Sequence, residues 1–332
     1  MMFNNHRSSR STVRRLAISL VALTPLAMTP VLAQEFTSQP ITMVVGYPPG
    51  GSNDIVARMI SKPLGDALGT TIVVENKAGA NGTIGAQHVV KANPDGHTIL
   101  LSSVSPVVLS PQTMAKAPYH SPTDFVPINT VGLTPEAIAT GPALKVKNLK
   151  ELLEHAKTQP VTLSSSGAGG LPHLTIELLK SASNGNIVHV PYKGAGPAVT
   201  DTLAGHVSGI VMDLPPLYSL IKDGKLNALA VTSAERVSFL SEVPTAQEVL
   251  PDFHVVNWVG IFAPAGTPPA VIERYDAAIK KVLEQPEVRA QLEKVAVVPS
   301  VMASPSEFQK FFNNEYQRWG AVIKQAGLSM KD

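Results

Sequence analysis

A glycine-rich turn between a buried strand and a helix most constrains what this chain can fold into. Ile41–Val45 is an apolar, mostly β-branched run and predicts a buried strand. Prolines and glycines at 48–51 end it, and apolar residues then recur every four positions, at Val56, Ile60 and Leu64. This spacing predicts a helix with Ser52 as N-cap and Asp54 in its first turn. The free N–H groups of such a helix start can bind an anion, and a simple strand-to-helix connector is the alternative.

The first 33 residues have the pattern of a removable signal peptide. Four arginines precede a mostly apolar run at 16–28, and Val31, Leu32 and Ala33 supply a cleavage region. The chain has no cysteine that could carry a lipid anchor. We therefore predict a secreted, periplasmic, soluble protein. The Arg14-Arg15 pair leaves twin-arginine export open beside the general route.

Charge and cysteine content exclude several classes of function. Cleavage after residue 33 removes four arginines and leaves 23 Lys+Arg against 25 Asp+Glu, so the formal charge changes from +2 to −2. No basic run then remains to bind nucleic acid. Without cysteine the chain can form no disulfide, thiol nucleophile or cysteine-based metal site.

The strand-turn-helix pattern recurs along the chain in two sets. Strands are predicted at 71–75 and 98–102 and, after a change of composition near Thr134, at 161–164, 187–190, 208–212 and 226–231. Such repeats indicate an α/β protein with mainly parallel sheets, in which ligands bind beyond the carboxyl ends of the strands. The turns there carry glycines and hydroxyls and little charge. The aromatic residues of a helix at about 305–326 are expected to pack in the core.

Motifs for catalysis are missing from these turns. The chain contains no G-x-x-x-x-G-K-[ST], no G-x-S-x-G and no complete dinucleotide-binding loop. His173 and Glu177 are the closest approach to a metal pattern. His173 near Ser166 is the one base–nucleophile candidate for a secreted hydrolase or isomerase. We predict no catalytic residue, no metal and no cofactor.

Several blocks in a fixed order resemble one family. They are VVGYPPGGSNDIVAR, VVENKAGANGTIGAQHVVKANPDGHTILL, SSSGAGGLPHL, VPYKGAGPAVTDTLAGHV, GKLNALAVTS, VPTAQEV and WVGIFAPAGTP, followed by a terminal tryptophan-containing helix. They look like those of the Bug family, the extracytoplasmic substrate-binding receptors of tripartite tricarboxylate transporters. The resemblance covers essentially the whole mature chain. It implies a two-lobe periplasmic-binding-protein (Venus flytrap) fold, each lobe a mainly parallel sheet flanked by helices, with lobe 1 at 34–135 plus 258–332 and lobe 2 at 136–257.

The resemblance also implies a function and partners. A receptor of this kind holds a small carboxylate-containing organic acid between its lobes and delivers it to the integral membrane permease subunits of its transporter. It is expected to act as a monomer without enzymatic activity, and a role in signalling is an alternative to transport.

The resemblance places ligand contacts at particular residues. In lobe 1 they are Tyr47, Gly50, Ser52, Asn76, Gly79, Ser102, Ser103 and Ser105. In lobe 2 they are Ser166, Gly167, Gly170, His173, Tyr192, Lys193, Gly194 and Asp213. Tyr192 and Lys193 could instead only seal their loop, and Asp213 could cap a helix or meet a cationic ligand group. Gly170 stands where the family often has serine, so one hydroxyl donor is missing. Pro63 is expected to interrupt the first helix.

Overall fold

Alternating strands and helices form the part of the chain that the computed structural model describes, residues 39–325 and 327. The predicted signal peptide, 1–33, lies outside these residues. Every described residue belongs to one compact unit, Phe36–Asp332. Among the described helices, none combines the length and the apolar character needed to cross a membrane.

The strands pair in two groups that share one long strand, β4 (Phe125–Thr140). We call residues 39–135 and 256–325 half A, and residues 136–255 half B. Half A contains β1 (Ile41–Val45), β2 (Ile72–Asn76), β3 (Thr98–Ser103), β9 (Val256–Pro264) and β10 (Val298–Pro299). Half B contains β5 (Val161–Ser165), β6 (Ile187–Pro191), β7 (Gly209–Asp213) and β8 (Asn227–Val231).

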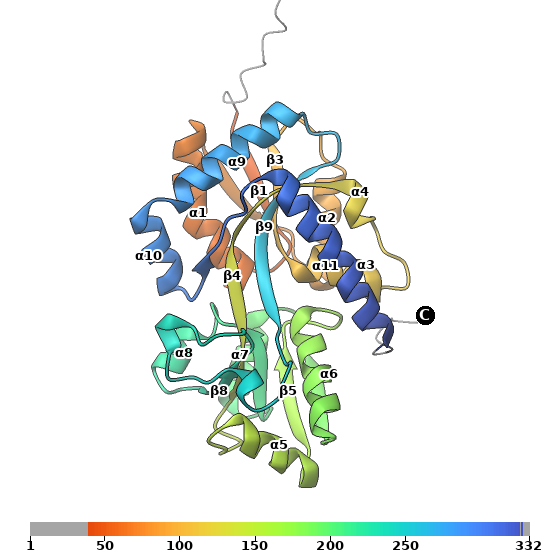
Figure 1. Cartoon of the computed structure of the whole chain (residues 1–332), viewed down its shortest axis with the longest axis vertical. Helices are drawn as coiled ribbons and strands as arrows, with labels where there is room; N and C mark the ends of the chain where they lie inside the picture. Colours follow the sequence, from red (N-terminus) through yellow and green to blue (C-terminus); the bar gives the residue numbers. More distant parts are fainter. Residues whose placement is uncertain (1–38, 326, 328–332) are drawn as a thin grey trace, which may run out of the picture. The chain divides into compact units, whose positions relative to one another are not determined.

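The strand β4 joins the two halves. Its residues from Phe125 to Pro135 pair antiparallel with β9, and its residues from Glu136 to Thr140 pair antiparallel with β7 and β8. Figure 1 shows β4 and β9 running side by side. The strand order is β2-β1-β3-β9-β4-β7-β5-β6. Strands β1, β2 and β3 are parallel, as are β5, β6 and β7, and every antiparallel pair involves β4 or β9. The α/β class is confirmed, and the sheet is mixed because these two strands connect its parallel parts.

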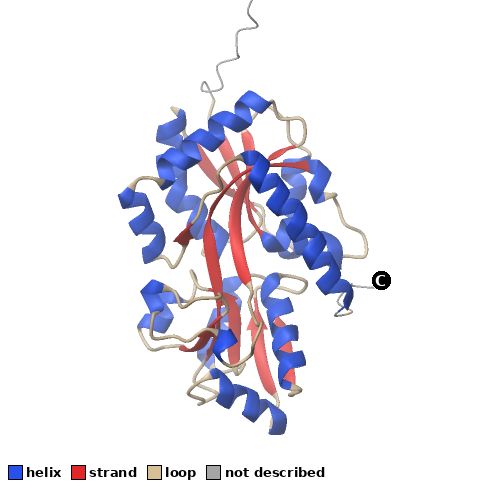
Figure 2. Ribbon diagram, viewed as in Figure 1, coloured by secondary structure: helices blue, strands red, loops and turns tan. Residues whose placement is uncertain are grey.

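Helices flank the strands in both halves (Figure 2). In half A they are α1 (Ser52–Leu68), α2 (Thr83–Val90), α3 (Ser110–Thr113), α4 (Ser121–Asp124), α9 (Pro269–Leu283), α10 (Pro286–Lys294) and α11 (Pro305–Gln325). In half B they are α5 (Leu149–Thr158), α6 (Leu171–Ser183), α7 (Ala195–Ala204) and α8 (Tyr218–Lys222). A π-helix, Ser105–Leu109, follows β3 directly.

The core lies on both faces of the half A sheet. Ile41, Met43 and Val45 of β1 pack in one cluster with α1 and α9, whereas Val44 packs in another with α2 and α11. Side chains of a strand alternate between faces, so β1 is buried on both, which explains its unbroken apolar sequence.

Two local predictions need correction, and one long strand was missed. The N-cap of α1 is Gly51, and Ser52 is the first helical residue. Pro63 lies inside α1 without ending it. The strand β4 was not predicted, because its sequence contains Pro127, Gly132 and Pro135. Its pairing with β9 shifts register between Pro127 and Asn129 and again before Gly132, and such bulges accommodate residues that interrupt a regular ladder.

The aromatic residues of α11 are core residues, as predicted. Phe308 is fully buried, with its ring centroid 5.6 Å from that of Trp258 and 5.3 Å from that of Phe262. These contacts attach α11 to β9, the strand that runs beside β4.

We expect Phe308→Ala to lower the free energy of unfolding by about 3–5 kcal/mol, because it leaves a cavity against β9. Phe311, which is only partly buried on the same helix, provides the control Phe311→Ala, with a smaller loss. Denaturant unfolding of both variants measures the difference. Phe311 also contacts Trp258, so the two variants differ in the depth of burial, and equal losses would contradict the cavity argument.

Candidate functional site

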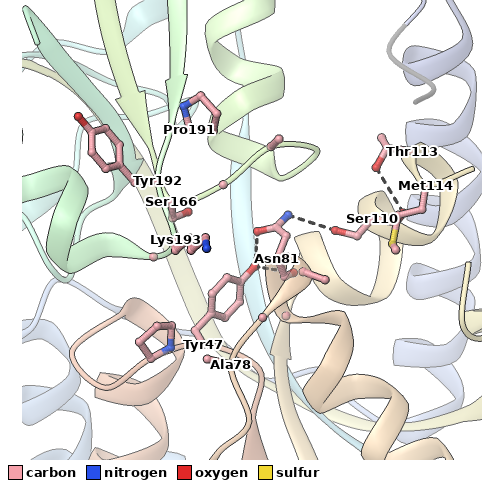
Figure 3. Close-up of a pocket in the computed structure, with 17 residues that line it drawn as sticks. Tyr47, Ala78, Asn81, Ser110, Thr113, Met114, Ser166, Pro191, Tyr192 and Lys193 are labelled. Carbon is pink, nitrogen blue, oxygen red and sulfur yellow. Dashed lines mark hydrogen bonds between the residues drawn. The ribbon is translucent and has the colours of Figure 1, made fainter. Parts of the chain in front are cut away.

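The two halves together line a cavity of about 620 Å³. From half A its wall contains Tyr47, Pro48, Ala78, Gly79, Ala80, Asn81, Gly82, Ser110, Thr113 and Met114. From half B it contains Ser166, Gly167, Ala168, Pro191, Tyr192, Lys193 and Gly194. This volume falls within the range of small-molecule sites. We call it the outer cavity, and Figure 3 shows its lining.

A second cavity of about 30 Å³ shares part of this wall. Its lining is Tyr47, Pro48, Gly51, Ser52, Asn53, Ser103, Ser105, Ser166, Pro172, Ala195, Met212 and Asp213. We call it the inner cavity, and it has room for about one water molecule. Tyr47 and Ser166 border both cavities, so the turns after β1 and β5 lie at one site.

Tyr47 is held on the half A side by the turn before α2. Its hydroxyl donates to Asn81 Oδ1 at 3.0 Å, and the backbone oxygen of Asn81 lies 3.2 Å away. Burial, together with the nearby Asp213 carboxylate, raises the pKa of Tyr47 well above its ordinary value. The tyrosine is therefore a neutral hydrogen-bonding group at any physiological pH.

Asn81 brings half A against the first glycine-rich loop of half B. It has a left-handed backbone (φ 51°), and its Nδ2 donates to Ser110 Oγ at 3.1 Å. A Cβ atom added at Gly170 would lie 2.5 Å from Asn81 Nδ2, and one at Gly167 would lie 3.3 Å from Asn81 Oδ1. Asn81 was not among the predicted contacts. Its signal was an asparagine directly before Gly82 in a glycine-containing turn, because asparagine tolerates positive φ.

The carboxylate of Asp54 lies at the start of α1 and accepts hydrogen bonds there. Asp54 accepts from the backbone N–H of Gly50 at 2.9 Å and from Asn76 Nδ2 at 2.8 Å, and it pairs with Arg58. Burial acts to raise the pKa of Asp54, but hydrogen bonds from Arg58, Gly50 and Asn76 lower it below its ordinary value. The charge that would attract an external anion to this helix start is therefore already compensated. Gly50 and Asn76 line neither cavity.

The three predicted serines at the end of β3 and just beyond it do not form an open loop. Ser102 and Ser103 end β3 and Ser105 begins the π-helix, and all three are buried. Ser103 and Ser105 line the inner cavity, whereas Ser102 does not. Ser105 Oγ accepts a hydrogen bond from the N–H of Leu171 at 2.9 Å. The first N–H of α6 is therefore already bonded to a half A side chain. The next residue, Pro172, has no N–H to offer.

Two stacked histidines hold the loop between β5 and α6. His173 Nδ1 accepts from the N–H of Gly169 at 3.0 Å, and His189 Nε2 lies 2.6 Å from Ser165 Oγ. Their ring centroids are 4.0 Å apart. Burial lowers the pKa of both histidines, that of His189 to about 3, and keeps the rings neutral at pH 7. Gly170 and His173 themselves line neither cavity.

The surroundings of His173 bear on the metal and enzyme alternatives. His173 Nε2 and Glu177 Oε1 are 3.9 Å apart, and within the described residues no group of three or more His, Asp or Glu side chains could hold a metal ion. The histidine-paired serine is Ser165, which is fully buried, and not the cavity-lining Ser166.

The second half B loop places Lys193 and Gly194 in the outer cavity wall. Gly194 has φ 105°, and its N–H donates to the carbonyl of Ser166. The Tyr192 hydroxyl donates to Asp201 Oδ2 at 2.7 Å, and this hydrogen bond raises the pKa of Tyr192. The Tyr192 ring contributes to the wall, while its hydroxyl is directed away from Tyr47 (Figure 3).

Asp213 ends β7 beside the inner cavity. It accepts from Asn257 Nδ2 at 3.0 Å and from the Ser52 side chain, so its partners are side chains and it caps no helix amide. Burial raises its pKa to about 6. The cross-strand neighbour Glu136 is fully buried, and burial together with Asp213 raises its pKa well above the ordinary value.

Comparison with known proteins gives a consistent result. Residues 56–328 match the tripartite tricarboxylate transporter family receptor. The protein BugT of Bordetella pertussis is 36% identical over 91% of this chain and 94% of its own. The periplasmic binding protein BugD is 32% identical, with a TM-score of 0.81 over 89% of this chain and 99% of its own. The structure of R. palustris Rpa4515 with adipate is 29% identical, with a TM-score of 0.84 over 87% and 98%. The predicted two-lobe periplasmic-binding-protein fold is thereby confirmed.

We expect Gly170→Ala to destabilise the protein by about 1–3 kcal/mol through overpacking. The backbone of Gly170 (φ −96°) suits any residue, so the cost comes from the contact of the new Cβ with Asn81 Nδ2. In an Asn81→Gly background, which keeps the positive φ accessible, the same change should cost much less. A double-mutant cycle by denaturant unfolding measures this coupling, and additive effects would contradict it.

The depressed pKa of His189 predicts a pH dependence of stability. As pH falls from about 6.5 towards 3, the unfolded chain takes up a proton that the folded chain refuses, so the free energy of unfolding decreases. His189→Gln removes this difference in proton uptake between the folded and unfolded chains. The melting temperature of the native protein should therefore fall more between pH 7 and 4 than that of the variant. The exposed His254 provides the control His254→Gln, which should follow the native protein. A native–variant difference that is independent of pH would contradict the assignment.

Proposed function

The chain belongs to the tripartite tricarboxylate transporter receptor family, and we propose that it is an extracytoplasmic solute-binding receptor for a small carboxylate-containing organic acid. The acid would be captured between two lobes and delivered to the membrane subunits of a tripartite tricarboxylate-type transporter. We place the protein in the periplasm as a monomer, after removal of residues 1–33.

The observation that carries the proposal is the outer cavity with one wall from each half. Tyr47 and Asn81 line it from half A, and Ser166 and Lys193 from half B. A solute in this space contacts both halves at once. Since a ligand shifts a conformational equilibrium only by its differential affinity for the two states, such a solute favours the closed arrangement.

We propose that the lobes are 34–135 plus 258–332 and 136–257. The chain crosses between them within β4, at Pro135–Glu136, and again at the start of β9, near Asn257. Both crossings lie in paired strands rather than in long loops. Closure would then be a hinge motion absorbed by a few residues at these two points.

The groups available to a carboxylate lie mainly in half B. Among the described residues, the Lys193 ammonium and the Ser166 hydroxyl have no hydrogen-bond or ion-pair partner, although both line the outer cavity. The helix α7 begins beside them at Ala195, after Gly194. Its first N–H groups add a positive partial charge at the same place. The adipate bound in the Rpa4515 structure is an acid of the size that this site would take.

No feature of the cavity favours catalysis over binding. Neither histidine of the stacked pair lines it, and the relatives named above are receptors or binding proteins. A role in signalling remains the alternative to transport, because capture of the solute is common to both.

Calorimetry against mono-, di- and tricarboxylic acids tests the proposal, with uncharged solutes of similar size as controls. We expect at least one acid to bind and the uncharged solutes not to bind. Binding of uncharged solutes alone would refute carboxylate recognition. Chemical turnover of a bound acid would show that the protein is an enzyme and would refute the receptor function.

We expect Ser166→Leu to weaken binding of that acid at least about tenfold, or 1.4 kcal/mol, because the larger side chain fills the boundary of both cavities. The control is Ser181→Leu, at an exposed position of α6, which should bind as the native protein does. Both variants should retain the native melting temperature to within a few degrees. Unchanged affinity in Ser166→Leu would remove this loop from the site.

A further inference from the structure

The wall of the outer cavity is mainly apolar. Its side chains include Pro48, Ala78, Ala80, Met114, Ala168 and Pro191, drawn from both halves. A solute body placed between them gains free energy by leaving water in proportion to its apolar area. A charged group placed against them gains no partner and loses its hydration. The wall therefore favours a hydrocarbon body.

One cation serves the whole outer cavity. Lys193 is the single charged side chain in its lining, and its ammonium has no carboxylate partner among the described residues. Lys77, on the neighbouring half A turn, is paired with Glu75 at 2.6 Å and does not line the cavity. The available positive charge therefore matches one carboxylate, on the half B side of the cavity where Lys193 and Ser166 lie.

The inner cavity offers a second carboxylate little space and few free donors. Apart from Ser166, its hydroxyl and side-chain amide donors are already directed at acceptors of the protein: Ser52 at Asp213, Asn53 at Ser103, Ser103 and Ser105 at Tyr47, and Tyr47 at Asn81. About 30 Å³ of space is left, enough for one water molecule.

Asp213 adds an electrostatic reason. Its carboxyl group lines the inner cavity, and once ionised it repels any second acidic group that approaches. Asn257 and Ser52 compensate Asp213 by hydrogen bonds, and within the described residues no cation pairs with it.

We infer that the solute of this receptor is an acid with a single carboxylate on an apolar body, rather than a di- or tricarboxylate. The inference rests on the proposed function and narrows it to one ligand class. The carboxylate lies at Lys193 and Ser166, and the body lies against Met114, Ala80 and Pro48.

Hexanoate and adipate test the inference on the native protein, because they share a six-carbon chain and differ only in whether the far end is a methyl group or a second carboxylate. Hexan-1-ol serves as the control that lacks a carboxylate altogether. Calorimetry at pH 7.5 should give a dissociation constant for hexanoate at least about tenfold lower than that for adipate, with hexan-1-ol weaker than hexanoate.

The outcomes separate the inference from the function on which it rests. Adipate binding as tightly as hexanoate, or more tightly, overturns the single-carboxylate inference and leaves the receptor function standing. Hexan-1-ol binding as tightly as hexanoate overturns carboxylate recognition itself. If neither these acids nor any acid of the calorimetric panel binds, both proposals fail together.

A variant tests the cause of the discrimination. Met114 is partly buried in the apolar wall, and Met114→Lys supplies the missing second cation with a chain of similar length. The ratio of adipate affinity to hexanoate affinity should then rise at least about tenfold. In Met114→Leu, which keeps the wall apolar, the ratio should stay as in the native protein. An unchanged ratio in a folded Met114→Lys protein overturns the charge argument.

Discussion

The antiparallel pairing of β4 with β9 is the constraint on which the rest of the structure depends. Because β4 continues from this pairing into its pairing with β7, the two halves share one backbone ladder. The carboxyl ends of the parallel strands in each half then lie next to the same space. The segments after β1, β3 and β5 supply Tyr47, Ser105 and Ser166 to it, and the last residue of β7 supplies Asp213. Each half adopts a familiar α/β arrangement, but the shared strand decides that their ligand-binding edges face each other.

Hydrogen bonds within the protein satisfy most polar groups at this junction. Ser105 accepts a hydrogen bond from the first amide of α6. Asn81 accepts one from Tyr47 and donates one to Ser110, and Asn257 donates one to Asp213. Buried donors and acceptors must be paired, and here the Ser105–Leu171 and Asn257–Asp213 pairs join the two halves. The groups left for a solute are therefore few, chiefly Ser166 and Lys193 beside the start of α7. Selectivity then depends on which polar groups the protein leaves unpaired, more than on how many polar residues line the site.

The loop between β5 and α6 contains three glycines and is restrained by a pair of stacked histidines. Gly167, Gly169 and Gly170 permit a close approach to Asn81 and Thr113, because a Cβ at these positions would crowd those side chains. The stacked pair of His173 and His189 restrains the same loop through Gly169 and Ser165. Desolvation keeps both rings neutral, so an acceptor nitrogen remains available to Gly169. The loop is restrained by two histidines that line neither cavity, and such support is usual where a binding geometry must be held with little tolerance.

The sequence alone determined the α/β class, nearly all the short strands and the long helices, because local apolar periodicity and turn chemistry suffice for these. It also identified most of the turns around the cavities, since glycine, proline and hydroxyl residues mark them. Only the tertiary structure decided that β4 is one strand, because Pro127 and Gly132 are accommodated by bulges that form against β9. Only the tertiary structure brought Asn81 into the site and directed Asn76 and Gly50 to Asp54. Local sequence specifies which groups a turn can offer, whereas the contacts that use up some of those groups come from segments far apart in the chain.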